Sequence, residues 1–207
     1  MKPLPASRCA LFLGLALAAA AGDLYSKHVV FRDLGYPARV LVPDRPGLHE
    51  IFQPGTDPAG RVVEGESAPY LEGWLEFRLY TSFNEGALWG VGQGWTWLFA
   101  SLSVLAIAGV TYWLFVRKAA ASAWLTVALA FITGGTLGNL FDRLGLHGCQ
   151  AVDTGATRHA VRDFLLFTFG GWNWPVFNFA DAFLVTGAIM LVLQSFLLPE
   201  RKEPERS

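Results

Sequence analysis

The chain has 207 residues, 53% of them hydrophobic, with eight Trp, sixteen Phe and a formal net charge of −1. This length fits one domain or two small ones. The near-zero net charge provides no basic surface for a nucleic acid, so we expect no nucleic-acid partner. The charges are clustered, and the long stretches between them carry no Asp, Glu, Lys, Arg or His, which is typical of a membrane protein.

The first apolar run, Cys9 to Gly22, allows two interpretations. Its short length and Ala-rich end fit a cleaved secretory signal. Alternatively, the helix continues to about Phe31, which gives ~24 residues and a length of ~36 Å. We favour the spanning helix, because Asp23 and Lys27 are four residues apart and would pair on one face where the helix reaches the membrane surface.

The segment that follows, 32–94, begins with many Pro, Gly and Asp residues, which indicate turns. Further along, Leu75, Phe77 and Leu79 alternate with more polar side chains, which is the period of a half-buried strand. The sequence therefore predicts a small β-sheet in this segment, lying on the membrane surface.

Three further runs predict spanning helices at about 95–116, 120–141 and 177–198, because each has the length that crosses a bilayer. With the first helix at about 8–31, the prediction is a single integral membrane domain over residues 1–207. Its fold class is all-α, with four transmembrane helices and the small sheet outside the membrane. The connecting segments are 32–94 and 142–176.

Basic residues occur before the first predicted helix, between the second and third, and after the fourth. With four spans these groups share one side, which the positive-inside tendency assigns to the cytoplasm. Both termini are then cytoplasmic, and the two long connecting segments lie on the outer side. The basic residues are Lys2, Arg8, Arg117, Lys118, Arg201, Lys202 and Arg206.

The polar residues near the outer ends of the helices are brought to one depth by this topology. Asp181 lies inside an apolar run, where a carboxylate is costly and is rarely kept without a partner or a task. Asp163 lies eighteen positions upstream. Two neighbouring carboxylates cannot both ionise comfortably, so one would hold a proton while the other accepts a proton from a water attacking a carbonyl. This pair predicts aspartic-protease chemistry without a metal or cofactor.

Other polar residues have structural interpretations beside functional ones. Asn139, Asn178 and Arg143 would hold the carboxylates or the substrate backbone through hydrogen bonds. Asn178 could equally be a helix cap and Asn84 a turn residue. The Asp142–Arg143 neighbours are as consistent with an ion pair as with catalysis.

Alternative chemistries fit less well. The sequence contains neither a His-Glu-x-x-His zinc motif nor a Gly-x-Ser-x-Gly nucleophile motif. Ser26 and Lys27 are adjacent, so they point in different directions on a helix and do not form a serine–lysine dyad. A proton-coupled transporter component with Asp181 as its relay is the alternative from another class. A relay usually distributes ionisable groups across the membrane depth, whereas this chain gathers them at one end of the helices.

Taken together and in order, these motifs resemble the lipoprotein signal peptidase family, also called signal peptidase II. They are Asp23-x-x-x-Lys27, Asn84-x-Gly86-Ala87-x-x-Gly90, Gly134-Gly135-x-x-Gly138-Asn139-Leu140-x-Asp142-Arg143, Asp163-Phe164 and Gly170-Gly171-Trp172-x-Trp174-Pro175-x-Phe177-Asn178-x-Ala180-Asp181.

The resemblance implies a four-helix aspartyl endopeptidase of the bacterial inner membrane, acting as a monomer near the outer face. Its partners would be membrane lipids and diacylglyceryl-modified prolipoproteins, which it would cut just before the lipidated cysteine. Asp163 and Asp181 would be the catalytic pair. The residues expected to bind substrate or support the site are Asp23, Lys27, Asn84, Gly86, Asn139, Arg143 and Asn178.

The sequence departs from the family pattern in three places. The connecting segments 32–80 and 144–162 are expanded, and the second expansion makes Asp153 a rival for the first catalytic acid. We retain Asp163, because Phe164 and the spacing to the later motifs fit the family better. Arg162 stands where the family has an apolar residue, and we expect its charge to favour an ionised Asp163.

Overall fold

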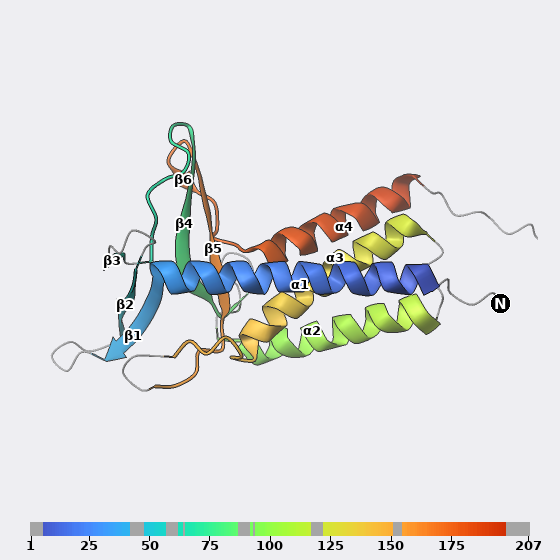
Figure 1. Cartoon of the computed structure of the whole chain (residues 1–207), viewed down its shortest axis with the longest axis horizontal. Helices are drawn as coiled ribbons and strands as arrows, with labels where there is room; N and C mark the ends of the chain where they lie inside the picture. The colour runs from blue at the N-terminus through green and yellow to red at the C-terminus, as the bar shows by residue number, and fades with distance from the viewer. Residues whose placement is uncertain are drawn as a thin grey trace, which may run out of the picture.

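The computed structural model of the chain describes residues 6–41, 48–56, 62–63, 65–86, 92, 94–116, 122–150 and 155–197. Four long helices dominate it (Figure 1). They are α1 (Ala6–Leu34), α2 (Thr96–Thr111) with its π-helical continuation η2 (Tyr112–Val116), α3 (Ala123–Arg143) and α4 (Phe179–Leu197). Each helical stretch is long and apolar enough to cross a membrane, as the charge-free runs predicted.

Helix α3 is the centre of the bundle, packing against α1, α2 and α4. Most of α3 is buried, whereas α2 and α4 expose apolar side chains such as Leu105 and Val185. The close approach of α3 to α4 requires a glycine, because a Cβ at Gly135 would lie only 2.4 Å from the backbone oxygen of Ala180. The small residues of α3 thus allow close helix packing.

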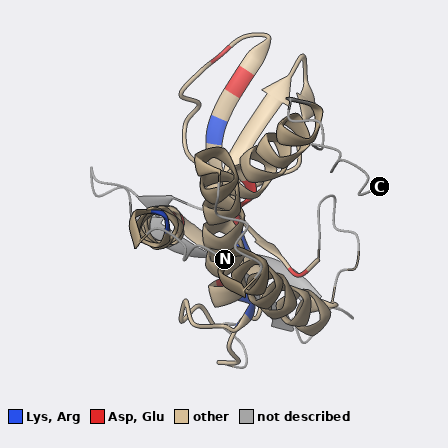
Figure 2. Ribbon diagram, turned by 90° about the vertical axis from the view of Figure 1, so that its right-hand side faces the viewer, with Lys and Arg blue, Asp and Glu red and all other residues tan. Residues whose placement is uncertain are grey.

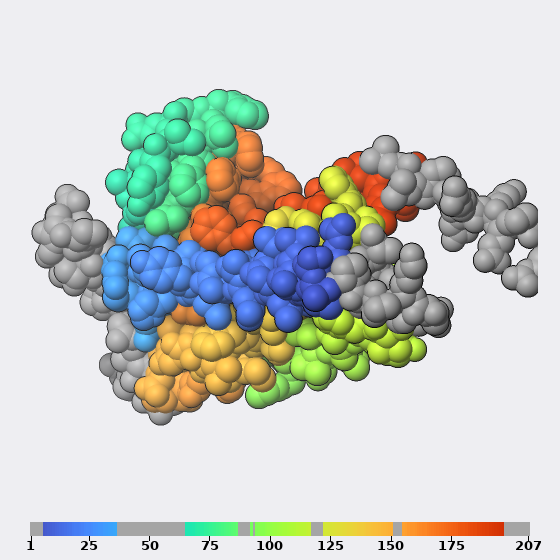
Figure 3. Space-filling model, turned by 45° about the vertical axis from the view of Figure 1, so that its right-hand side comes forward, coloured from blue at the N-terminus to red at the C-terminus, as the bar shows by residue number. Residues whose placement is uncertain are grey.

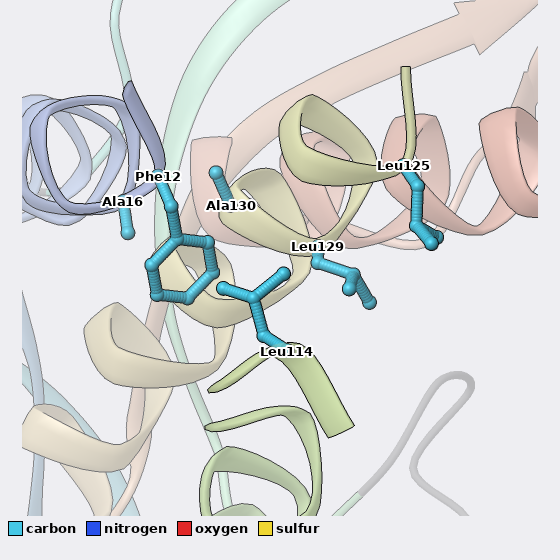
Figure 4. Close-up of a cluster of buried hydrophobic side chains, with 6 residues drawn as sticks. All are labelled: Phe12, Ala16, Leu114, Leu125, Leu129 and Ala130. Carbon is cyan, nitrogen blue, oxygen red and sulfur yellow. The ribbon is translucent and has the colours of Figure 1, made fainter. Parts of the chain in front are cut away.

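A cluster of buried apolar side chains packs one end of the bundle. Figure 4 shows these side chains converging from α1, η2 and α3. We refer to them as the apolar cluster: Phe12, Ala16, Leu114, Leu125, Leu129 and Ala130. This end contains the beginnings of α1 and α3 and the far end of α4, so successive helices run in opposite directions (Figure 1).

The connecting segments form two three-stranded antiparallel sheets at the other end of the bundle. One contains β1 (Gly35–Leu41), β2 (Leu48–Thr56) and β3 (Val62–Val63). The other contains β4 (Leu75–Asn84), β5 (Val161–Phe169) and β6 (Trp172–Asn173). A register shift between Leu79 and Ser82 places Ser82 opposite Asp163.

The sheets require a correction to the predicted fold class. The strand expected around 75–79 does form, but its partner β5 comes from the second connecting segment, so this sheet is not confined to the first one. The all-α label therefore fits the bundle but not the connecting segments. Viewed from the N-terminal end, the helix ribbons are mostly uncharged, while charged segments colour the strand that stands beside them (Figure 2).

Candidate active site

The sheet end of the bundle brings together the residues that the sequence singled out. Asp23 and Lys27 come from α1, and Asn139 and Arg143 from α3. The remaining residues come from β4 and the turn after it, from β5, and from the start of α4: Asn84, Gly86, Asp163, Asn178 and Asp181. Five elements, most of them distant in sequence, thus contribute to one polar site.

Asn178 and Asp181 form a reciprocal cap at the start of α4. The Asp181 backbone N–H donates to Asn178 Oδ1 at 3.0 Å, and the Asn178 backbone N–H donates to Asp181 Oδ2 at 3.3 Å. This arrangement satisfies amides that have no partner within the helix. The cap interpretation of Asn178 is therefore right, and it also fixes the direction of the Asp181 carboxylate.

The Asn178 side chain also connects the two aspartates. Its Nδ2 donates to Asp163 Oδ1 at 2.5 Å and to Asn139 Oδ1 at 3.2 Å. Asn139 in turn donates from Nδ2 to Asp181 Oδ1 at 2.8 Å. Asn178 therefore contacts both aspartates, and Asn139 connects its side chain to Asp181.

Asp163 lies in β5 with only 2% of its surface exposed. Asn84 Nδ2 donates to its Oδ2 at 3.0 Å, so both carboxyl oxygens have an amide partner. Burial, and secondarily the negative charge of Asp181, raises the pKa of Asp163 from 3.8 to about 8. Asp163 is therefore protonated at neutral pH.

A buried cation, Lys27, is connected to the Asp163–Asp181 pair through Asn139. Lys27 is fully buried, with Nζ 2.7 Å from Asp23 Oδ2 and 3.1 Å from Asp142 Oδ2. Lys27 also donates to Asn139 Oδ1 at 3.0 Å, which joins the charges to the amide that holds Asp181. A buried charge needs such partners, because leaving it unpaired costs several kcal/mol.

Asp23 fixes the start of α4 through a hydrogen bond to the backbone of that helix. Its Oδ1 accepts a hydrogen bond of 2.8 Å from the backbone N–H of Ala180. The opposite face of Asp23 lies against Gly138, where a Cβ would come within 2.3 Å of Oδ2. Only glycine at this position allows α3 to pass so close to the carboxylate.

Arg162 behaves differently from the expectation. Its Nε and Nη2 donate to Asp142 Oδ1 at 3.0 and 2.8 Å, and its backbone N–H donates to Asp142 Oδ2 at 3.0 Å. The guanidinium therefore neutralises Asp142, and the pKa of Asp163 is raised by burial despite its basic neighbour. Asp142 pairs with Arg162 and Lys27, and the ion pair suggested with Arg143 is not formed.

Arg143 instead reaches towards β4. Its guanidinium donates to the Gly86 oxygen at 3.3 Å and to the Asn139 oxygen at 3.5 Å, and it lies 5.5 Å from the ring centre of Phe99. Gly86 is itself fixed by a 3.0 Å hydrogen bond from its N–H to Asn84 Oδ1. These contacts tie the turn after β4 to the end of α3.

We refer to the polar residues that meet at this end as the polar cluster: Asp23, Lys27, Asn84, Asn139, Asp142, Arg162, Asp163, Asn178 and Asp181. All are buried except Asn84 and Asp181, which are half-buried. Asp153, the rival for the first acid, and Gly90 of the second motif lie outside the described residues. Among the residues that are described, no three His, Cys, Asp or Glu side chains could hold a metal ion.

An apolar cleft of about 550 Å³ opens beside Asp181, between β5 and α4. Its walls include Phe167, Phe177 and Val185, and Asp181 is its single ionisable lining residue. Figure 3 shows the concave surface where the strand segment meets the start of α4. The half-buried Asp181 carboxyl group is thus reached from a largely hydrocarbon surface, and the buried Asp163 lies behind it.

Sequence reasoning missed the partners of Asp142. Arg162 was recognised only as a departure from the family pattern, and the contact of Asp23 with the Ala180 backbone was not foreseen. The available signal was the pair of opposite charges, Asp142 and Arg162, flanking one connecting segment. The charge pattern alone does not predict that the segment between Asp142 and Arg162 folds back so that these two residues meet.

A family model described as Signal peptidase (SPase) II matches residues 15–197. The chain is 42% identical over 193 residues to a lipoprotein signal peptidase of Rhodopirellula baltica, covering 93% of this chain and 74% of the relative. It is 40% identical over 147 residues to the lipoprotein signal peptidase of Serratia proteamaculans, covering 69% and 78%.

Two solved bacterial membrane enzymes share the fold. One aligns with a TM-score of 0.59 over 94% of both chains at 19% identity. The other has a TM-score of 0.57 over 91% of this chain and 93% of its own, at 21% identity. The family match over most of the chain, its curated relatives and the shared fold agree: the chain belongs to the signal peptidase II family of membrane peptidases.

Proposed function

We propose that this protein is an aspartyl endopeptidase that removes the signal peptide from diacylglyceryl-modified prolipoproteins, cutting just before the lipidated cysteine. The observation that carries the proposal is the amide bridge: Asn178 contacts both Asp163 and Asp181, and Asn139 joins Asp181 to the same hydrogen-bonded network. A shared-proton pair is the arrangement that hydrolyses an amide without a metal or a covalent intermediate.

The two aspartates take different roles in the proposed reaction. Asp181 borders the cleft as a carboxylate and accepts a proton from a water whose oxygen attacks the scissile carbonyl carbon. Asp163, protonated because burial raises its pKa to about 8, donates its proton to the carbonyl oxygen. Asp181 then passes the proton to the leaving nitrogen as the C–N bond breaks, and Asp163 recovers its own proton when the new carboxyl group forms.

The cleft supports a lipid-linked substrate. Its aromatic and aliphatic walls suit an acyl chain or an apolar signal helix, and Val185 and Thr186 extend it along α4 away from the sheet. A substrate anchored in the bilayer would enter sideways, because α4 exposes its apolar side chains. The scissile bond would then lie at the head of α4, beside Asp181.

The proposed orientation follows from charge placement. The basic residues near the chain ends and between α2 and α3 assign those ends to the cytoplasm. The polar cluster then lies towards the outer face of a bacterial inner membrane, where the modified cysteine of an exported precursor would be. We propose that the chain acts there as a single integral domain and a monomer.

Cleavage of a synthetic diacylglyceryl-modified precursor, run beside its unlipidated twin, tests the proposal. We expect the reconstituted protein to cut only the lipidated precursor, with the same rate in a chelator. Asp163→Asn and Asp181→Asn should each lower turnover about 10²–10⁴-fold, because each removes one proton-transfer group.

Asp33→Asn is the matched control, because Asp33 pairs with Arg32 on the exposed end of α1 and touches none of the polar cluster. Near-normal turnover in either active-site variant would refute the assignment. Liposome proton flux that depends on Asp181, without cleavage, would support the transporter alternative instead.

A further inference from the structure

Arg162 is buried beside a proposed catalytic residue but faces away from it. Only 3% of its surface is exposed, and it immediately precedes Asp163 in β5. Successive side chains of a strand point to opposite faces, so Arg162 and Asp163 lie on different sides of the sheet. Whatever Arg162 contributes to Asp163 must therefore pass through the strand backbone or through its partner Asp142.

Asp142 is shared between two cations. One carboxylate oxygen, Oδ1, accepts both hydrogen bonds of the Arg162 guanidinium. The other, Oδ2, accepts from the Arg162 backbone N–H at 3.0 Å and faces Lys27 Nζ at 3.1 Å. Two guanidinium donors on one carboxylate oxygen and a backbone N–H on the other fix direction as well as distance, so they hold the first residues of β5 against the end of α3.

A continuous line of polar contacts then runs from Arg162 to the other aspartate. Lys27 donates to Asn139, and Asn139 donates to Asp181. The four charges at the base of this line, Asp23, Lys27, Asp142 and Arg162, sum to zero. Because Arg162 supplies one of the two positive charges, its removal leaves this buried group with a net charge of −1.

We propose that Arg162 is a positioning residue of the active site, which fixes the β5 backbone at Asp163 and neutralises Asp142 so that Lys27 remains available to Asn139. This inference rests on the proposed function of the Asp163–Asp181 pair. It makes an unusual residue of the expanded connecting segment part of the geometry that the catalytic pair requires.

The proposal has an electrostatic consequence that a merely structural role lacks. The charged groups facing Asp163 are Asp181 from α4, Lys27 from α1 and Arg143 from α3. Without Arg162, Asp142 keeps only Lys27, which it shares with Asp23, and the resulting net negative charge disfavours a second carboxylate nearby. Ionisation of the pair then requires a higher pH. Both limbs of the pH–rate profile, the acidic and the basic, therefore shift to higher pH.

The test compares Arg162→Met and Arg162→Lys, using the full-length protein in proteoliposomes and the lipidated precursor. Met keeps an unbranched apolar stem but loses the charge and the hydrogen bonds, whereas Lys keeps the charge and loses the paired guanidinium donors. We expect Arg162→Met to lower kcat up to about 100-fold with KM changed less than about twofold, because only the alignment of the reacting groups is lost. Arg162→Lys should recover part of kcat and keep the wild-type pH limbs.

A double variant separates charge from folding. Arg162→Met with Asp142→Asn returns the net charge of the group to zero, so its pH limbs should return towards those of the wild type although the hydrogen bonds are gone. This variant also serves if Arg162→Met alone does not fold. Arg158→Met is the control, because Arg158 is a buried arginine of the same segment that lies over the Phe83 ring, 4.4 Å from its centre.

Wild-type kcat and pH limbs in Arg162→Met would overturn the proposal. So would equal losses in the Met and Lys variants without any movement of the limbs, or limbs in the double variant that stay shifted. These outcomes are read only against a wild type that cleaves and an Asp163→Asn variant that does not. If that comparison fails, the proposed function itself is wrong.

Discussion

Helices α1 and α3 contribute buried side chains at both ends of the bundle, but the two ends have opposite chemistry. The apolar cluster packs side chains such as Phe12 and Leu129 without a charge, whereas the polar cluster buries Asp23 and Lys27 from the same α1 helix. Packing requires volume and tolerates substitution of similar shape. A buried polar network requires every partner, because a half-satisfied one is costly. The two ends should therefore respond differently to mutation.

The largest loss of stability is expected at the polar end. Lys27→Met removes the cation that contacts Asp23 and Asp142, leaving carboxylates without compensation. We expect unfolding in detergent to become easier by about 3–5 kcal/mol, together with loss of cleavage. Thermal unfolding monitored by circular dichroism measures this. A stability equal to that of the wild type would show that the charges are not coupled as described.

The apolar end should be almost as sensitive to lost volume but not to altered shape. Leu129→Ala leaves a cavity at a residue that is 2% exposed and should cost about 2–5 kcal/mol of unfolding free energy. Leu129→Met, which conserves volume, should cost less than about 1.5 kcal/mol. Both variants should retain the wild-type pH dependence of cleavage. A shifted pH profile in either variant would show that the apolar end is coupled to the active site.

A single methyl group tests the tight contact between α3 and the polar cluster. Gly138→Ala places a Cβ against Asp23 Oδ2, so the carboxylate must move and its bond to the Ala180 N–H must lengthen. We expect a cost of about 1–3 kcal/mol and reduced turnover. Gly22→Ala is the control, because no atom lies within 4 Å of a Cβ there. Equal effects of the two variants would contradict the contact.

The smallest expected effect is a gain in stability, caused by Asp163→Asn. Because the pKa of Asp163 is raised to about 8 in the folded protein, the folded state binds a proton that the unfolded chain releases above its ordinary value of 3.8. This residue therefore makes stability fall as pH rises from about 4 to 8. Asp163→Asn should remove that dependence and stabilise the protein by about 0.5–2 kcal/mol at pH 7. Thermal melts across the pH range measure it, and destabilisation at neutral pH would count against a protonated Asp163.

The helices could be predicted because an uncharged run of sufficient length leaves few alternatives. Strand β5 could not, since Val161 to Leu166 are all buried and a strand buried on both faces has no alternating pattern. Asp163 was consequently placed in a plain connecting segment. Its closeness to Asp181 was expected from topology, but the bridging role of Asn178 depends on side-chain directions that only the folded chain defines.

The charge pairing shows the same limit. Spacing of four residues predicted Asp23 with Lys27, and this pair forms. Adjacent residues suggested Asp142 with Arg143, but neighbours on a helix diverge, and Asp142 meets Arg162 from another element. Local periodicity thus predicts contacts within an element, while contacts between elements depend on the path of the connecting segment.

Infrared titration of the carboxyl groups tests the shared proton most directly. The wild type should contain a protonated carboxyl at neutral pH that titrates near pH 8 and is missing from Asp163→Asn. Absence of that signal at neutral pH, because the carboxyl group already loses its proton near the ordinary aspartate value of 3.8, with cleavage intact, would contradict the account.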